Sequence, residues 1–323
     1  MKIYGITMGD ASGVGPEIVL KAARDGDLRQ PSVVFGDYSV LDRANRELSF
    51  GVQLRRVAHP SEWRPEAGLA ILDHNLQSAS EVTPGQLNKA AGHAAREYVI
   101  SAAKSALAGD IAAMVTLPMN KEATQLTDPR FTGHTELIGE VCGVADVTIM
   151  LASPSLIVTH VSTHCSLREA IERCKKPRIS TIVELTWHAV RRLNPEARIA
   201  VAGLNPHAGE HGLFGDEEIL EIAPAVEWAR SQGYAVDGPL PPDTLFYLAV
   251  VRKKYDAIVC MYHDQGHIPS KLLDFEGGVN IALGLPIVRT SVDHGTAFDI
   301  AWKGVASTRS FLCAMDFAER LTR

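Results

Sequence analysis

The sequence lacks the features that assign a protein to a class at first sight. It has no basic block, and its net charge of −6 makes nucleic acid and anionic membranes poor partners. Its five cysteines form no C-x-x-C pair, and an odd number is typical of reduced thiols in a cytosolic protein. No apolar run is long enough to span a bilayer, and the apolar start of the chain is too short for a signal peptide. We therefore expect a cytoplasmic globular protein.

The two common nucleotide-binding fingerprints are also missing. The glycine-rich segment Gly9-Asp-Ala-Ser-Gly-Val-Gly-Pro-Glu17 reads G-x-x-x-G-x-G, which is neither the G-x-G-x-x-G of Rossmann folds nor a Walker A loop. Pro16 opens a helix, in a first-turn position that proline tolerates. The segment can be a plain strand-to-helix turn or a ligand-binding turn. Its carboxylates, Asp10 and Glu17, disfavour a simple phosphate cradle because they carry the same charge as the ligand.

Short apolar runs alternate with amphipathic stretches, and this pattern predicts an α/β fold. A chain of 323 residues with 46% hydrophobic content exceeds one typical core, so we expect two domains. No flexible linker or internal repeat is present, which predicts domains joined by crossing elements, with both ends of the chain in one domain. The expected elements include strands at 32–36, 147–152, 156–161 and 257–261, helices at 88–108 and 216–232, and a proline-rich loop at 237–244.

Three strand ends carry a histidine. The apolar runs that start near 156, 198 and 257 lead into His164, His207 and His263. Parallel strands present ligands at their carboxyl ends, and neutral imidazoles bind first-row metals. The three histidines are therefore candidate ligands of one divalent metal ion.

Other residues compete for this site or complete it. His160 and His267 are alternative ligands, since His160 and His164 would share one face of a strand and spacing alone does not choose between them. Asp243 and Asp264 are candidates to complete the metal shell or to orient its histidines.

Several further polar groups could meet an anionic ligand. Lys271, Asn280 and Arg289 follow the same region, and converging cations suit a phosphate or a carboxylate. His134 and Thr135 start a predicted helix, where exposed amide groups favour an anion. Each residue alone also fits an ordinary surface position or helix cap, so only the constellation indicates a site.

The chain resembles the 4-hydroxythreonine-4-phosphate dehydrogenase family from about Ile3 to about Phe311. That family includes relatives that act on D-threonate or D-erythronate 4-phosphate, and it belongs to the isocitrate and isopropylmalate dehydrogenase-like superfamily. The motifs that carry the resemblance are Gly9–Glu17, Gly133-His-Thr-Glu136, Gly203-Leu-Asn-Pro-His-Ala-Gly-Glu210, Gly238-Pro-Leu-Pro-Pro-Asp-Thr-Leu-Phe246, Met261-Tyr-His-Asp-Gln-Gly266 and the segment Gly278–Thr296.

The resemblance implies a fold of two α/β/α domains with a cleft between them. We expect the first domain to comprise 1–125 and 265–323, and the second, with the metal histidines and the dimer contacts, to comprise 126–264. The resemblance implies a homodimer with its active site at the subunit interface. It also implies metal ligands at His164, His207 and His263, substrate contacts from His134, Thr135, Lys271, Asn280 and Arg289, and candidate catalytic groups at Lys271, Asp264 and Asp243.

A more distant similarity concerns the cofactor. His294-Gly-Thr-Ala-Phe-Asp-Ile-Ala-Trp-Lys-Gly304 resembles the NAD loop of isocitrate and isopropylmalate dehydrogenases, whose N-terminal turn also resembles Gly9–Glu17. The resemblance implies NAD or NADP bound without a Rossmann fingerprint. The residues implied to bind it are His294, Gly295, Thr296, Ala297, Asp299 and Ile300. Trp302 departs from this pattern, because a small residue is common there.

The implied reaction is a metal-assisted oxidation and decarboxylation of a 4-phosphorylated 3-hydroxy acid, with Zn, Mg or Co as the metal and pyridoxine biosynthesis as the family's usual setting. One departure bears on the substrate: Thr7-Met-Gly-Asp10 stands where biosynthetic members commonly have Thr-Pro-Gly-Glu, and it is closer to relatives of sugar-acid catabolism. A cis-dihydrodiol dicarboxylate dehydrogenase, a three-histidine metallohydrolase and an inactive ligand-binding relative are the alternatives.

Overall fold

The structure is a computed structural model that describes residues 1–323 and divides into two compact units. Met1–Val147 and Leu285–Thr322 form the first unit, and Thr148–Gly284 form the second. The first unit is therefore discontinuous in sequence. Its boundaries fall at 147 and 285, whereas the sequence-based division has them at 125 and 265.

The first unit contains a six-stranded parallel sheet in the order β3-β4-β2-β1-β5-β12. All residues of β1, β2, β5 and β12 are buried, so both faces of the sheet centre are covered. Its strands are β1 (Tyr4–Thr7), β2 (Ser32–Gly36), β3 (Leu54–Val57), β4 (Leu69–Asp73), β5 (Ala113–Thr116) and β12 (Arg289–Val292). Its helices are α1 (Gly15–Arg24), α2 (Tyr38–Glu47), α3 (Lys89–Ala108), α4 (Lys121–Gln125), α5 (His134–Cys142) and α11 (Arg309–Thr322), with single 3-10 turns at Pro60–Glu62 and Ala79–Glu81.

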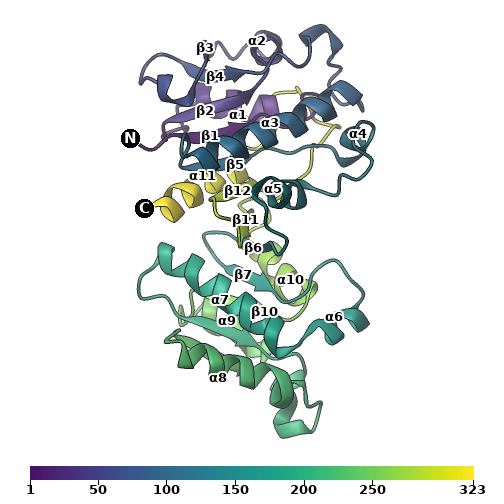
Figure 1. Ribbon diagram of the computed structural model, residues 1–323, viewed down its shortest axis with the longest axis vertical. Helices are drawn as coiled ribbons and strands as arrows, with labels where there is room; N and C mark the ends of the chain where they lie inside the picture. The colour runs from purple at the N-terminus through teal and green to yellow at the C-terminus, as the bar shows by residue number, and fades with distance from the viewer. The chain divides into compact units, whose positions relative to one another are not determined.

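Helix α3 packs against β1, β2 and β5, and α11 packs against β5 and β12 (Figure 1). The Asn88 side chain caps α3 by accepting a hydrogen bond from the Ala91 amide at 3.1 Å, and Gly109 ends the helix at a φ of 81°. With 20 residues α3 is the longest helix of the chain. Neither it nor any other helix combines the length and the apolar character needed to cross a bilayer.

The second unit contains strands in the order β11-β6-β7-β10-β8-β9. β6 pairs antiparallel with β7 and β11, while β7, β10, β8 and β9 run parallel. Its strands are β6 (Thr148–Ala152), β7 (Ile157–His160), β8 (Ile199–Ala202), β9 (Val236–Leu240), β10 (Ala257–Cys260) and β11 (Val279–Leu283). Its helices are α6 (Leu167–Arg173), α7 (Lys176–Leu193), α8 (Ala223–Ser231), α9 (Pro242–Val250) and α10 (His263–Leu273), with a 3-10 segment at Pro206–Gly212 and a π-helical turn at Glu218–Ile222.

Parallel pairing of β7, β10 and β8 has a direct consequence for the site. Ile258 of β10 lies beside Val158 of β7 and Ala200 of β8, so the carboxyl ends of these three strands reach the same edge of the sheet. The segments that carry the candidate metal histidines leave the sheet at this edge. The side chains behind it form a core that includes Leu151, Val158, Leu245 and Ile258.

The structure corrects three expectations about local conformation. Residues 237–240, the first half of the loop expected at 237–244, belong to β9; Pro239 is tolerated there because β9 is the edge strand of the sheet. Residues 263–266, expected at the carboxyl end of a strand, open helix α10, which continues to Leu273 despite the helix-breaking residues Gly266 and Pro269. Strand β7 ends at His160, so His164 lies in the following loop and the argument from strand period does not apply to it.

Candidate functional site

His164 and His263 lie together at the carboxyl edge of the second unit's sheet. Their ring centroids are 5.6 Å apart, because the loop after β7 and the start of α10 leave neighbouring strands. Both residues line a cavity of about 310 Å³, together with Thr163, Cys165, Leu167, Ala170, Tyr262 and Asp264. The sequence-based expectation that these two strand ends meet is thus realised in the geometry.

Asp264 orients the ring of His263. The Nδ1 atom of His263 lies 2.7 Å from Oδ1 of Asp264. When Nδ1 carries the proton and donates a hydrogen bond to the carboxylate, the lone pair of Nε2 is left for a metal ion. The arrangement therefore presents one oriented imidazole donor.

His160 and His267 form a layer behind this pair. His267 stacks on His263 with centroids 3.7 Å apart and an interplanar angle of 8°, and its Nδ1 lies 3.2 Å from Nε2 of His160. Burial, followed by the neighbouring histidines, lowers the pKa of His160 to about 3, which keeps this ring neutral. Gly266 makes room for His160, since a Cβ at position 266 would lie 2.4 Å from its Nε2. The Nε2 atom of His160 therefore contacts His267 rather than facing a ligand.

His207 lies on a turn with an unusual backbone. Residues 207–211 are consecutively left-handed, with φ of 53° at His207, 54° at Ala208, 45° at Glu210 and 58° at His211 around Gly209. A left-handed non-glycine residue costs roughly 1–2 kcal/mol, so the four together cost about 4–8 kcal/mol. Strain of this size persists only where surrounding contacts enforce it, and it is concentrated at functional sites.

The ring of His207 is exposed and contacts Phe214, with centroids 6.1 Å apart. No three His, Cys, Asp or Glu side chains of the single chain are grouped so that they could hold a metal ion. Within one chain, His164 and His263 therefore lie close together, and His207 is not grouped with them. Asp243 lies exposed in the first turn of α9.

In the first unit, several candidate residues lie near the segment that follows β5. Arg289, the first residue of β12, is 3% exposed and donates a hydrogen bond from Nη2 to Oγ1 of Thr116 at 2.8 Å. Its Nε is buried without a partner. Burial lowers the pKa of Arg289 to about 10, an effect that the Glu136 carboxylate partly opposes. A desolvated cation with a free N–H is suited to an anionic ligand.

His134 lies at the start of α5, close to the same strand exit. Burial first, then the cations Arg289 and Lys121, lower its pKa to about 3, while a hydrogen bond to the Leu117 backbone opposes the shift. Its Nε2 is buried and has no partner. The other ring nitrogen is hydrogen-bonded to the Leu117 backbone, so in the neutral ring Nε2 is free to accept a hydrogen bond from a hydroxyl group.

Asp10 reaches this strand exit from the glycine-rich turn. Its amide donates to the Pro118 carbonyl at 2.8 Å, and its Oδ1 accepts from the Ser12 amide at 2.8 Å. Its Oδ2 is buried without a partner. Burial raises the pKa of Asp10 to about 6, although the Ser12 and Asn120 amides lower it. The sequence predicts the turn but indicates no role for this carboxylate.

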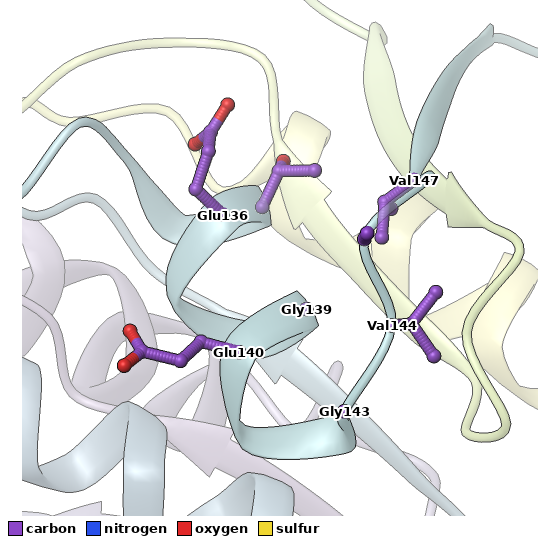
Figure 2. A pocket seen from close by; sticks show the side chains of 8 residues that line it. Glu136, Gly139, Glu140, Gly143, Val144 and Val147 are labelled. Carbon is purple, nitrogen blue, oxygen red and sulfur yellow. The ribbon is translucent and has the colours of Figure 1, made fainter.

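A second hollow lies beside Thr135, and sequence reasoning did not anticipate it. It has a volume of about 480 Å³ and is lined by α5 and the segment that follows, from Thr135 to Val147. In Figure 2 the side chains of Glu136 and Glu140 point away from Val144 and Val147, so one wall is apolar and the carboxylates lie at the other side. Small residues on α5 and its cap, Gly139 and Gly143, leave this space open.

The predicted cofactor loop packs against the glycine-rich turn of the first unit. The Val14 amide donates to the Thr296 carbonyl at 3.0 Å, and Oε1 of Glu17 accepts from the Ala306 amide at 2.7 Å. The indole of Trp302 is 9% exposed and donates to the Ala11 carbonyl at 3.1 Å. Trp302 thus holds the loop in place, while His294, Gly295 and Asp299 remain exposed.

The predicted substrate residues are divided between the units. His134, Thr135 and Arg289 belong to the first unit, and Lys271 and Asn280 belong to the second. Lys271 lies on α10 with its Nζ 5.2 Å from the ring centroid of Phe275. Asn280 lies in β11, opposite Leu151 of β6.

Comparisons with known proteins cover most or nearly all of the chain and agree with one another. A family model described as "Pyridoxal phosphate biosynthetic protein PdxA" matches residues 27–318. The chain is 43% identical over 324 residues to a D-threonate 4-phosphate dehydrogenase of Salmonella typhimurium, covering 99% of each chain. It is 43% identical over 321 residues to a 4-hydroxythreonine-4-phosphate dehydrogenase of Beijerinckia indica, covering 98% of this chain and 94% of the other.

A solved structure supports the same relationship. The crystal structure of a 4-hydroxythreonine-4-phosphate dehydrogenase from Klebsiella pneumoniae superposes with a TM-score of 0.91 at 43% identity, covering 100% of both chains. The α/β fold class expected from the sequence is thereby confirmed. With the family model and relatives of this identity in agreement, the chain belongs to the PdxA family.

Proposed function

We propose that this protein is a cytoplasmic, NAD(P)-dependent and divalent-metal-assisted dehydrogenase that oxidises and decarboxylates a 4-phosphorylated 3-hydroxy acid. The relatives named above are dehydrogenases, and so is this chain: an oxidoreductase that acts on a CH–OH group. D-Threonate 4-phosphate and 4-hydroxythreonine 4-phosphate are the two candidate substrates. The segment Thr7-Met-Gly-Asp10 favours the first. The observation that carries the proposal is the pair His164 and His263 in a chain of this family.

The donor set fits a divalent metal. Imidazole nitrogens suit Zn²⁺ and Co²⁺ better than Mg²⁺, which prefers oxygen. His164, His207 and His263 would hold the ion, with the His263 ring oriented by Asp264. When bound, the metal supplies Lewis-acid stabilisation of the substrate hydroxyl and its adjacent oxygen. Lys271, Asp264 and Asp243 are the proposed catalytic groups.

We propose a homodimer in which a second copy completes the metal site. The single chain brings together only two of the three histidines, and large apolar side chains are exposed on the segments that follow His207 and His263. Leu213 and Phe214, which follow His207, are 72% and 47% exposed, and Leu272 and Phe275, which follow His263, are 85% and 73% exposed. Exposed apolar side chains of this size mark a surface that another chain covers.

His134, Thr135, Lys271, Asn280 and Arg289 are the proposed substrate contacts. The unpartnered Nε of Arg289 would donate to a phosphate or carboxylate oxygen. The unpartnered Nε2 of His134 would accept a hydrogen bond from a substrate hydroxyl or from a protonated phosphate oxygen. Filling both positions removes two buried unsatisfied groups, which favours the bound state.

Residues His294, Gly295, Thr296, Ala297, Asp299 and Ile300 are proposed to bind NAD or NADP, which supplies the hydride acceptor. The Val14 amide holds the Thr296 carbonyl and the Glu17 carboxylate holds the Ala306 amide just after the loop, which fixes the loop from one side and leaves its exposed residues available. A Cβ at Gly295 would meet nothing within 4 Å, so there is space for a ligand beside this residue.

A substrate panel tests the proposal. NADH or NADPH formation is followed with D-threonate, D-erythronate and 4-hydroxythreonine 4-phosphates in the presence of Zn²⁺, Mg²⁺ or Co²⁺. We expect turnover with at least one of the three, and loss of that turnover in His207→Ala. No reduction of either nucleotide with any combination would contradict the proposal.

A three-histidine hydrolase would bind the metal without a dinucleotide. Thermal denaturation with NAD and NADP separates the two activities, because a ligand that binds the native state stabilises it by RT ln(1 + [L]/Kd), about 2.7 kcal/mol at 100 times Kd. The dehydrogenase is stabilised by one of the two nucleotides, and the hydrolase by neither.

A further inference from the structure

The left-handed turn that carries His207 is held from behind by the buried carboxylate of Glu218, which shares the side-chain amide of Asn205 with Glu217, whose Oε2 accepts from Nδ2 at 2.6 Å. Glu218 is 3% exposed. Its Oε1 accepts hydrogen bonds from the amides of Leu204 and Asn205, each at 2.7 Å. Its Oε2 accepts from Nδ2 of Asn205 at 2.9 Å. The carboxylate therefore fixes the backbone two and three residues before His207.

The surrounding residues are shaped to admit this carboxylate. A Cβ at Gly209 would lie 2.8 Å from Oε2 of Glu218, and a Cβ at Gly203 would lie 3.1 Å from Oε1. Glycine at both positions thus allows the carboxylate to enter the concave side of the turn. Glu218 is also the first residue of the π-helical turn 218–222, a rare conformation that is frequent at functional sites.

We propose that Glu218 is the positioning residue that fixes the left-handed turn and so directs the His207 imidazole toward its ligand. The inference rests on the proposed function, in which His207 binds a divalent metal. His207 is exposed, with Phe214 as its ring contact, so its direction is set mainly by its backbone. Glu218 does not itself touch the ligand.

Three substitutions separate the contributions of charge and length. Glu218→Ala leaves the Leu204 and Asn205 amides without an acceptor. Glu218→Asp keeps the charge but withdraws the carboxylate by one methylene, so the two bonds at 2.7 Å cannot both persist. Glu218→Gln keeps the length and one acceptor oxygen, and is the conservative variant that should rescue most of the function.

Glu221→Gln is the matched control. Glu221 lies in the same π-helical turn and its Oε2 accepts from the Lys176 backbone amide at 2.8 Å, which is the same kind of bond. Its hydrogen bond and ion pair are with Lys176 and Lys175, outside the turn 203–211. If general loosening of the π-helical turn weakens metal binding, the Glu218 and Glu221 variants should both show it. If the effect acts through His207, only the Glu218 variants should show it.

The test measures Zn²⁺ affinity by titration calorimetry and the visible spectrum of the Co²⁺-loaded full-length protein. We expect Zn²⁺ binding to weaken 10- to 100-fold in Glu218→Ala and Glu218→Asp, as for other residues that orient metal ligands. The Co²⁺ spectrum, which reports ligand geometry, should change in the same variants. Glu218→Gln should fall between them and the unsubstituted protein, and Glu221→Gln should match the latter.

His207→Ala separates failure of this inference from failure of the proposed function. If His207→Ala binds Zn²⁺ as the unsubstituted protein does, the metal assignment itself is wrong. If His207→Ala loses Zn²⁺ while all folded Glu218 variants bind it normally with an unchanged Co²⁺ spectrum, the positioning role is refuted and the metal assignment stands. Should Glu218→Ala fail to fold, Glu218→Asp and Glu218→Gln decide the question.

Discussion

Replacing Asp10 by asparagine should change how the stability of this protein depends on pH. Asp10 is fully buried, one of its carboxylate oxygens has no partner, and burial raises its pKa to about 6 from an ordinary 3.8. In the unfolded chain the carboxyl loses its proton near pH 3.8. In the native protein it keeps the proton until about pH 6. Between these values the native state binds more protons, so the contribution of Asp10 to stability is present at low pH and falls as pH rises.

The two pKa values set the size of the effect. A shift of about two units corresponds to roughly 3 kcal/mol at 1.36 kcal/mol per unit. Asparagine keeps an oxygen that can accept from the Ser12 amide but does not ionise. The free energy of unfolding of Asp10→Asn, relative to the unsubstituted protein, should therefore rise by about 3 kcal/mol between pH 3.5 and pH 7.

Urea unfolding at several pH values, followed by tryptophan fluorescence, measures this difference. Trp302 donates to the Ala11 carbonyl, next to Asp10, and is a local reporter. Asp27→Asn, which removes an exposed carboxylate of the same unit, is the control. If the difference between Asp10→Asn and the unsubstituted protein is the same at pH 3.5 and pH 7, the carboxyl is not desolvated as argued.

Two further substitutions test the two halves of the candidate site. Gly266→Ala would place a Cβ 2.4 Å from Nε2 of His160 and 2.9 Å from Sγ of Cys260. We expect it to lower the free energy of unfolding in urea by about 1–3 kcal/mol, with Gly295→Ala as the unstrained control. If the two variants have the same free energy of unfolding, α10 shifts to accept the methyl group without penalty. Arg289→Met removes a desolvated cation whose pKa is lowered to about 10, so we expect the melting temperature to hold or rise while the KM for the phosphorylated substrate increases at least tenfold. An unchanged KM would remove Arg289 from the binding site.

The strands and long helices were predictable because local periodicity and end signals agree with the fold. The limits of 32–36 matched β2, and the 88–108 helix matched α3 with Asn88 as its cap. β9 and α10 were missed because Pro239 and Pro269 are locally unfavourable and only their place in the fold makes them acceptable.

The site was predictable to a different extent. Parallel pairing of β7 and β10 brings the segments after these strands to one edge, where His164 of the loop and His263 of α10 lie with ring centroids 5.6 Å apart. The left-handed conformation at His207 was not predictable, because it depends on Glu218, which lies eleven residues later and leaves no periodic pattern. The burial of Asp10 was also not predictable, because the loop that packs against it, 117–120, lies more than a hundred residues away in the sequence. The assignments of metal, substrate and cofactor residues remain predictions.

The division of the first unit between the two ends of the chain bears on the order of events during synthesis. β12 completes the sheet beside β5, and α11 covers both strands, yet both elements are made last (yellow in Figure 1). Thr148–Gly284 is synthesised as one continuous segment before β12 and α11. We therefore expect the second unit to fold first. Until β12 is made, one side of β5 is unpaired, so we expect chaperones to bind the N-terminal part of the first unit's sheet.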